Sequence, residues 1–218
     1  MKAVRILVLG DGKHEVGVKS DTPPEQGQEP ALLCLVRRLL NSPKSLSLDG
    51  RFFRGVRAAH GRGRNKYMKK TVSAIRKAKK EGYAGLAIVI DRDRYPDRDR
   101  LGAIREGREA LEGEAPAPCA LGCAAEAFDA WMLADRGAVA GAGGNVDALP
   151  PHPEDLPRPK DAADGVFGTT ASTGLGAHYA RVAAVVGLEL LKKSCPVGFS
   201  PFAKEVQQRL GPVVANAQ

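Results

Sequence analysis

Two carboxylates lie four residues apart in the segment Asp11-Gly12-Lys13-His14-Glu15, directly after a short apolar run. At the start of a turn or helix this spacing lets both side chains point to the same side. The glycines at positions 10 and 12 leave the backbone open to the close approach of a ligand. Such a pair can bind a metal ion or act as a general base. An ordinary turn is the alternative, since the segment matches neither a P-loop nor a dinucleotide-binding glycine motif.

A second pair, Asp91 and Asp93, follows the apolar run 85–90. Alternate carboxylates at the end of a strand suit Mg²⁺ (or Mn²⁺), because such hard cations prefer oxygen ligands and Mg²⁺ keeps several waters. We therefore predict that Asp11, Glu15, Asp91 and Asp93 bind a divalent metal ion. A salt-bridged loop is the alternative, because arginines surround the pair (Arg92, Arg94, Arg98 and Arg100).

A third acidic segment, EAFDAWMLAD at 126–135, reads as part of a helix over 124–135. Glu126 and Asp129 are three residues apart and share a face of that helix, so a carboxylate at its buried end can reach the same cluster. The sole tryptophan, Trp131, is predicted to be an anchor of the hydrophobic core.

The elements that must position these residues alternate along the chain. We predict strands at 3–9, 51–59, 85–90 and 117–121 and helices at 29–41, 66–81, 98–112 and 124–135. This order predicts an α/β fold with a central, mostly parallel, Rossmann-like sheet flanked by helices. Ligands of such sheets bind outside the carboxyl ends of the strands, so the carboxylates that follow the first and third strands should converge there.

The whole chain, 1–218, is predicted to form a single domain. The segment 137–160 is rich in glycine and proline and is expected to be an ordered excursion without regular elements. The segment 161–218 is expected to hold two helices, at about 176–193 and 201–210. These are too few for a separate core, so we expect this extension to pack on the same domain.

The net charge of +8 is concentrated in one stretch. Residues 51–80 carry 12 of the 33 basic residues and no acid, which leaves 21 basic and 25 acidic residues elsewhere, a balance of −4. This asymmetry predicts a polyanionic partner, which we take to be nucleic acid. A solvated basic helix is the alternative. The candidate nucleic-acid contacts are Arg62, Arg64, Lys66, Lys69 and Lys70.

Several classes of protein are disfavoured by the composition. No apolar run approaches the roughly 18 residues of a membrane span, and the run 6–9 is too short for the core of a signal peptide. We therefore expect a cytoplasmic protein without a membrane partner. The four cysteines lack zinc-site spacing and are expected to be reduced and mostly buried.

The motifs ILVLGDGKHE, AIVIDRD, FDAWMLAD, PEDLPRPKDA and KKSCPVGFSPFAKEV together resemble the small Toprim-like proteins grouped as DUF4276. The chain is more distantly similar to the Toprim domains of OLD-family nucleases, primases and topoisomerases. The resemblance spreads over nearly the whole chain. It implies a Toprim-like fold, a Mg²⁺-dependent site, and an ABC-type or OLD-type ATPase partner in defence against phage and mobile DNA.

The resemblance also implies roles for particular residues. Asp11 stands where the family's first-strand motif has its first Glu, His14 stands for its Thr, and Glu15 keeps its second Glu. Asp129 replaces the Glu of the family's Glu-Ala-Trp-Leu-Leu-Ala-Asp motif, and Lys160 matches a recurring Pro-Lys, which makes it a candidate phosphate contact. Both replacements shorten a carboxylate by one methylene, so the metal geometry differs or the activity is weakened.

These observations predict a Mg²⁺-dependent phosphodiesterase, a nuclease acting on DNA or RNA, with Asp11, Glu15, Asp129 and Lys160 as catalytic candidates. Asp11 or Glu15 would complete the metal site or serve as the general base. Two alternatives stay open: a catalytically weak or inactive regulatory subunit of an ATPase complex, and a phosphate-processing enzyme unrelated to nucleic acid. The sequence indicates no oligomeric state.

Overall fold

A four-stranded parallel sheet forms the centre of the protein in the computed structural model, which describes residues 3–17, 27–41, 46–59, 65–92, 99–170 and 174–216. The strands lie in the order β2-β1-β3-β4, and all neighbours are parallel. Their bounds are β1 Val4–Gly10, β2 Leu46–Phe52, β3 Gly85–Asp91 and β4 Cys119–Ala124. The predicted α/β class and the parallel central sheet are therefore confirmed.

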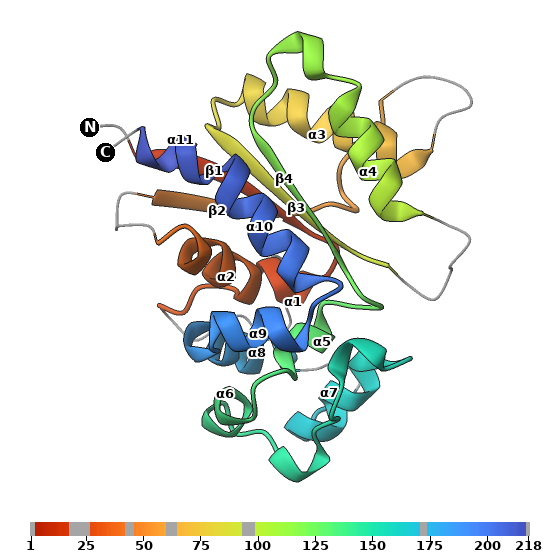
Figure 1. Ribbon diagram of the computed structural model, residues 1–218, viewed down its shortest axis with the longest axis vertical. Coiled ribbons are helices and arrows are strands. Elements are labelled where there is room, and N and C mark those ends of the chain that lie inside the picture. The colour runs from red at the N-terminus through yellow and green to blue at the C-terminus, as the bar shows by residue number, and fades with distance from the viewer. Residues whose placement is uncertain are drawn as a thin grey trace.

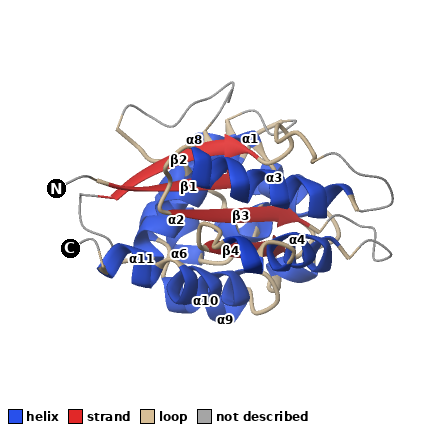
Figure 2. Ribbon diagram, turned by 90° about the horizontal axis from the view of Figure 1, so that it is seen from above, coloured by secondary structure: helices blue, strands red, loops and turns tan. Residues whose placement is uncertain are grey.

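Helices cover both faces of the sheet (Figures 1 and 2). Leu7 and Leu9 of β1 pack in one hydrophobic cluster with residues of α3 and α4, whereas Ile6 and Val8 pack in a second cluster on the other face. All four side chains are almost fully buried. Burial on both faces is the reason why β1 is a continuous apolar run without polar alternation.

The helices are short, and most of them follow the last strand. Their bounds are α1 Lys13–Val16, α2 Ala31–Leu39, α3 Lys66–Lys80, α4 Arg100–Glu109, α5 Asp129–Met132, α6 Arg136–Gly141, α7 Pro159–Phe167, α8 Leu175–Val185, α9 Leu188–Ser194, α10 Phe199–Arg209 and α11 Gly211–Ala215. Three short 3₁₀ turns lie at Glu112–Glu114, Val146–Ala148 and Pro153–Asp155. No helix in the described ranges is long and apolar enough to cross a membrane.

The second strand was predicted at 51–59, but β2 ends at Phe52 and begins five residues earlier than expected. The N–H of Phe53 donates to the carbonyl of Gly10, 2.9 Å away, and the chain then turns. Phe53 is buried in the cluster beneath α3 and stacks on Tyr67. The aromatic residues that suggested a strand therefore mark its end, where they serve the core.

The helix predicted at 124–135 was also wrong in extent. Strand β4 continues to Ala124, and only Asp129–Met132 forms a helix, α5. Asp135 begins a further helix, α6, by accepting hydrogen bonds from two N–H groups of its first turn. The segment 137–160 consequently contains most of α6 and two 3₁₀ turns, contrary to the expectation that no regular element fits there.

The C-terminal segment packs on the sheet through aromatic side chains. Trp131 is fully buried, stacks on Phe202 and meets Phe199 edge-on, as expected of a core anchor. The segment holds α7 to α11 rather than the two predicted helices. Between α8 and α9 the N–H of Gly187 donates to Asp135, 2.9 Å away, at the point where the predicted helix 176–193 is interrupted.

Glu154 joins two sequence motifs that lie more than 40 residues apart. Its two carboxylate oxygens accept hydrogen bonds from the N–H groups of Val197 and Gly198, each at 2.8 Å, and the residue is 7% exposed. The carboxylate thus fixes the segment that leads into α10 against the loop before α7.

We expect Glu154→Ala to lower the free energy of unfolding by about 2–3 kcal/mol, because the buried N–H of Gly198 and the partly buried N–H of Val197 lose their acceptor. Urea denaturation measures this change. The neighbouring Asp155 is exposed and provides the control, since Asp155→Ala should change stability by less than about 0.5 kcal/mol. Equal effects of the two substitutions would contradict this account.

Candidate functional site

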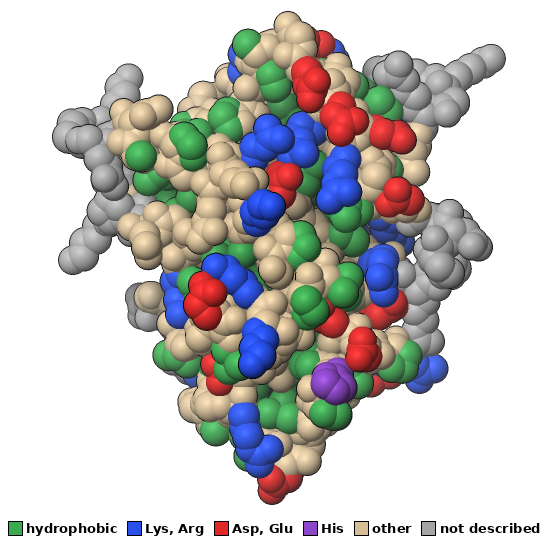
Figure 3. Space-filling view, in the orientation of Figure 1, with side chains coloured by type: hydrophobic (Ala, Val, Ile, Leu, Met, Phe, Trp, Pro, Cys, Tyr) green, Lys and Arg blue, Asp and Glu red, His purple; other side chains and the backbone are tan. Residues whose placement is uncertain are grey.

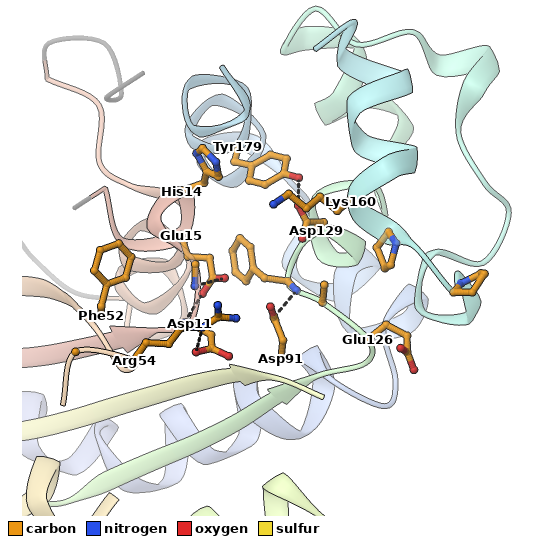
Figure 4. Close-up of a pocket in the computed structure, with 16 residues that line it drawn as sticks. Asp11, His14, Glu15, Phe52, Arg54, Asp91, Glu126, Asp129, Lys160 and Tyr179 are labelled. Atoms are coloured by element: carbon orange, nitrogen blue, oxygen red, sulfur yellow. Dashed lines mark hydrogen bonds and ion pairs between the residues drawn. The ribbon is translucent and has the colours of Figure 1, made fainter. Parts of the chain in front are cut away.

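A cavity of about 820 Å³ lies at the edge of the sheet where the acidic residues were predicted to meet (Figure 4). The chain proceeds from β1 to β2 on one side and then returns to β3 on the other, so the strand order reverses between β1 and β3. Asp11 follows β1 and Asp91 ends β3, which places both at the point where open α/β sheets bind ligands. The polar side chains around the cavity are Asp11, His14, Glu15, Arg54, Asp91, Glu126, Asp129, Lys160 and Tyr179.

The structure brings together most of the residues predicted for the site. Asp11, Glu15, Asp91 and Asp129 all line this cavity, as does Lys160. Lys160 is exposed and comes from the second residue of α7, far from the sheet in sequence. Asp93 lies outside the described residues.

Glu15 folds back over the loop that connects β1 to α1. Its two oxygens accept hydrogen bonds from the N–H groups of Asp11 and Gly12, at 3.1 and 2.9 Å. A Cβ at Gly10 or at Gly12 would lie 2.5 Å from a Glu15 carboxylate oxygen. The two glycines were predicted to admit a ligand, but what they admit here is the carboxylate of Glu15.

Asp11 is the most deeply buried acid at the strand ends, with its side chain 1% exposed. Its Oδ1 accepts a hydrogen bond from Nε of Arg54 at 3.0 Å. Its Oδ2 is buried and has no hydrogen-bond partner among the described residues. An unsatisfied buried carboxylate oxygen is costly, and one beside a cavity is a candidate ligand or general base.

Asp91 is held by the turn after β4 and Asp129 by a side chain of α8. Oδ1 of Asp91 accepts a hydrogen bond from the N–H of Phe128 at 3.0 Å, and Oδ1 of Asp129 accepts one from the hydroxyl of Tyr179. Glu126, in the same turn, has a positive φ of 57° although it is not a glycine. Such strain is typical of functional sites, and here it lets the chain turn so that Phe128 reaches Asp91.

Burial and mutual repulsion raise the proton affinity of this cluster. Burial raises the pKa of Glu15 well above its usual range, and the charges of Asp91, Asp129 and Asp11 raise it further. Burial also raises the pKa of Asp129, although the hydrogen bond from Tyr179 and the charge of Lys160 oppose the change. The cluster therefore favours anything that adds positive charge, whether a proton or a cation.

The donor set of the cavity fits Mg²⁺ or Mn²⁺ in its chemistry. Its acidic oxygens include one buried and unpartnered atom, Oδ2 of Asp11, and Mg²⁺ needs only one or two carboxylates because it keeps several waters. Within the described ranges no three His, Cys, Asp or Glu side chains are grouped closely enough to form a complete metal site. The agreement with Mg²⁺ or Mn²⁺ thus rests on the carboxylate oxygens around the cavity and on the unpartnered Oδ2 of Asp11.

Several residues of the cavity had no role in the sequence prediction. Arg54 was only one member of the basic stretch, and Tyr179 only a residue inside a predicted helix. Tyr179 is 1% exposed, and burial raises the pKa of its hydroxyl well above the usual value. No local pattern distinguishes either residue, since each reaches the cavity from an element distant in sequence.

The basic stretch 51–80 is not a uniformly basic surface. Acidic residues from elsewhere pair with Arg51 and Lys77, which both contact Glu81, and with Arg76, which contacts Glu114. On the face drawn in Figure 3, basic and acidic side chains are interspersed. The stretch itself contains no acidic residue, but acidic residues from outside it pair with several of its basic side chains.

The candidate nucleic-acid contacts have different environments. Lys66 is exposed and Lys69 is half-buried, both in the first turn of α3. Lys70 is buried, and its ammonium donates to the carbonyl oxygens of Arg54 at 2.6 Å and Phe53 at 3.3 Å. The expectation that Lys70 contacts nucleic acid needs correction, since its side chain is directed to these main-chain oxygens. Arg62 and Arg64 lie outside the described residues.

Comparisons of the chain with protein-family models, with curated proteins and with solved structures found no match.

The raised pKa of Glu15 predicts a pH-dependent stability. Below its ordinary value of 4.5 this carboxyl is protonated in both the folded and the unfolded state. Above that value the folded state keeps a proton that the unfolded state has lost, so the free energy of unfolding falls as pH rises through the raised pKa. Each unit of elevation corresponds to about 1.4 kcal/mol.

We therefore expect the wild type to lose stability relative to Glu15→Gln as pH increases from 4.5 to 8, measured by urea denaturation. Asp147→Asn is the control, because this carboxylate is 87% exposed on the chain's surface. Its pH profile should follow that of the wild type. Parallel pH profiles for Glu15→Gln and the wild type would rule out a raised pKa of Glu15 in the folded protein.

Proposed function

We propose that the protein is a Mg²⁺- or Mn²⁺-dependent phosphodiesterase of the Toprim type that acts on DNA or RNA. The observation that carries the proposal is the buried, unpartnered Oδ2 of Asp11 in a cavity lined by further carboxylates and by two basic side chains. Acidic oxygens would bind the cation, and the basic groups would contact the phosphate. A cavity that only bound an organic cation would have no need of Arg54 and Lys160.

In this proposal Asp11, which follows β1, and Asp91, which ends β3, would hold the divalent cation. A bound Mg²⁺ supplies positive charge next to the phosphate and lowers the pKa of a coordinated water. Glu15 fixes the loop that carries Asp11, and each of its oxygens retains a lone pair that can also contact the cation. With Asp11 bound to the cation, Glu15 would accept the proton of the attacking water.

The opposite wall of the cavity contributes Asp129, Tyr179 and Lys160 (Figure 4). The hydroxyl of Tyr179 fixes the orientation of the Asp129 carboxylate. Lys160 lies close enough to Asp129 for its charge to lower that carboxyl's pKa. Its exposed ammonium is the second group that can neutralise charge on a phosphoryl oxygen, in keeping with the role implied by the Pro-Lys motif.

The nucleic-acid substrate is supported by the position of the first turn of α3. The N–H of Ala59 contacts the carbonyl of Lys69, 3.4 Å away, so the loop that carries Arg54 lies against this turn. Lys66 is exposed in this turn and Arg54 in this loop. A phosphate backbone bound along these groups would lead into the acidic cavity, and its affinity would depend on salt.

A regulatory subunit of an ATPase complex is the alternative, favoured by the two shortened carboxylates, Asp11 and Asp129. The resemblance to DUF4276 proteins supports an ABC-type or OLD-type ATPase as the partner in either case. The same cavity would then bind phosphate without hydrolysis.

We expect Asp11→Asn and Asp91→Asn each to reduce Mg²⁺-dependent cleavage of DNA or RNA oligonucleotides at least about 100-fold, since each removes a charge at the reacting phosphate. Calorimetry should show weaker Mn²⁺ binding in both variants. Asp147→Asn, on the exposed surface, is the matched control and should cleave like the wild type.

Unchanged cleavage in both Asn variants would refute the assignment. If the wild type binds neither Mg²⁺ nor Mn²⁺, alone or with an ATPase encoded beside it, the regulatory alternative is favoured instead.

Lys66 and Lys70, both near the start of α3, should behave differently. Lys66→Ala should weaken nucleic-acid binding and reduce the slope of log affinity against log salt by about 0.9 for duplex DNA, as expected when one phosphate contact is lost. Lys70→Ala should instead lower the free energy of unfolding by about 1–3 kcal/mol, because two carbonyls lose a donor. Fluorescence anisotropy across salt concentrations and urea denaturation distinguish the two effects. An unchanged salt slope for Lys66→Ala would exclude it as a contact.

A further inference from the structure

The loop after β2 brings a guanidinium group to the acidic cavity. Nε of Arg54 lies 3.0 Å from Oδ1 of Asp11. The two partners differ in burial, because the Asp11 side chain is 1% exposed and that of Arg54 is 68% exposed. An exposed guanidinium is therefore paired with a buried carboxylate at the cavity, as Figure 4 shows.

The main chain at Arg54 is held in place by a buried cation. The ammonium of Lys70 donates to the carbonyl oxygens of Phe53 and of Arg54 itself, the latter at 2.6 Å. Burial lowers the pKa of Lys70 and the neighbouring charge of Lys66 lowers it as well, while the charge of Asp11 opposes the change. Burying an ammonium group costs free energy. Its place beneath this turn indicates that the main chain at Arg54 has to be held in one position.

We propose that Arg54 is the main phosphate-contacting residue of the cavity and that it exchanges Asp11 for a phosphoryl oxygen when the substrate binds. Lys70 is its positioning residue. This inference rests on the proposed function and assigns to it the group that recognises the anion. A guanidinium suits the role because its planar set of donors can bind two phosphate oxygens at once.

The exchange would couple anion binding to cation binding. In the free protein the positive charge of Arg54 opposes a second cation at Asp11. When phosphate draws the guanidinium away, Oδ1 of Asp11 joins the unpartnered Oδ2 as an available ligand. Each ligand should therefore strengthen the binding of the other, since such coupling is reciprocal.

The other basic residues near the cavity are placed less well for this role. Arg92 pairs with Glu126 at 3.0 Å, and Lys160 lies beside Asp129 on the opposite wall. Arg57 is exposed on the same loop as Arg54, three residues further on, but does not line the cavity. Arg57 thus provides a matched control for a general loss of positive charge.

The test is calorimetry of purified full-length variants with inorganic phosphate and, separately, with Mn²⁺. Arg54→Ala should weaken phosphate binding on the order of 10- to 100-fold, the loss expected for charge-assisted hydrogen bonds. The same variant should bind Mn²⁺ more tightly than the wild type when phosphate is absent. Arg57→Ala should match the wild type in both measurements, and Arg54→Lys should recover part of the phosphate affinity.

Opposite signs for the two ligands distinguish this role from a structural one. A misfolded variant would lose both affinities, and circular dichroism identifies it. Phosphate affinity in Arg54→Ala equal to that of the wild type, or a fall in its Mn²⁺ affinity with the fold intact, would overturn the inference. Lys70→Met, if folded, should weaken phosphate binding as well, and wild-type phosphate affinity there would exclude its positioning role.

Failure of the proposed function gives a different result. If no cleavage occurs but phosphate binding depends on Arg54, the hydrolase assignment fails and the anion contact stands. If Asp91→Asn abolishes cleavage while Arg54→Ala binds phosphate like the wild type, the hydrolase stands and this inference fails.

Discussion

Repulsion between carboxylates at the carboxyl edge of a parallel sheet is the constraint on which the arrangement of this protein depends. Asp11, Glu15, Asp91 and Asp129 share one cavity, and the charges of the other three raise the pKa of Glu15 beyond the effect of its burial. Like charges in a poorly hydrated site are unfavourable, so the surrounding chain must supply compensating groups. Much of the local structure can be understood as that compensation.

The compensation comes mainly from main-chain N–H groups, while buried cations fix the loops. Main-chain N–H groups bind Glu15 and Asp91, which satisfies these acids without neutralising them. Lys70 and Arg100 are buried and donate to main-chain carbonyl oxygens, Lys70 to that of Arg54 at 2.6 Å and Arg100 to that of Asp91 at 2.9 Å. The cations thus fix the loops that carry the charged side chains, and the acidic character of the cavity is retained.

The C-terminal helices complete the site as well as the core. Tyr179 of α8 and Lys160 of α7 form the wall opposite Asp11, while Trp131 packs against α10 and Glu154 fixes the segment before it. The same packing that buries the second face of the sheet therefore also forms a wall of the cavity. Polar groups on packed helices are held in fixed orientations before a ligand arrives, which lowers the cost of reorganisation on binding.

The sequence by itself determined the parallel sheet, the helix at 66–80 and the edge where the acidic residues meet. These follow from local patterns, which can be recognised within short segments of the sequence. The patterns are apolar runs that end in acids, for the strands, and apolar residues at helical spacing, for the helix. Only the tertiary structure decided which basic residues remain exposed, that Glu15 folds onto its own loop, and that Arg54 and Tyr179 reach the cavity. Burial and ion pairing depend on partners such as Glu81, Glu114 and Asp129, which come from other elements of the fold, and neither periodicity nor spacing along the chain encodes those contacts.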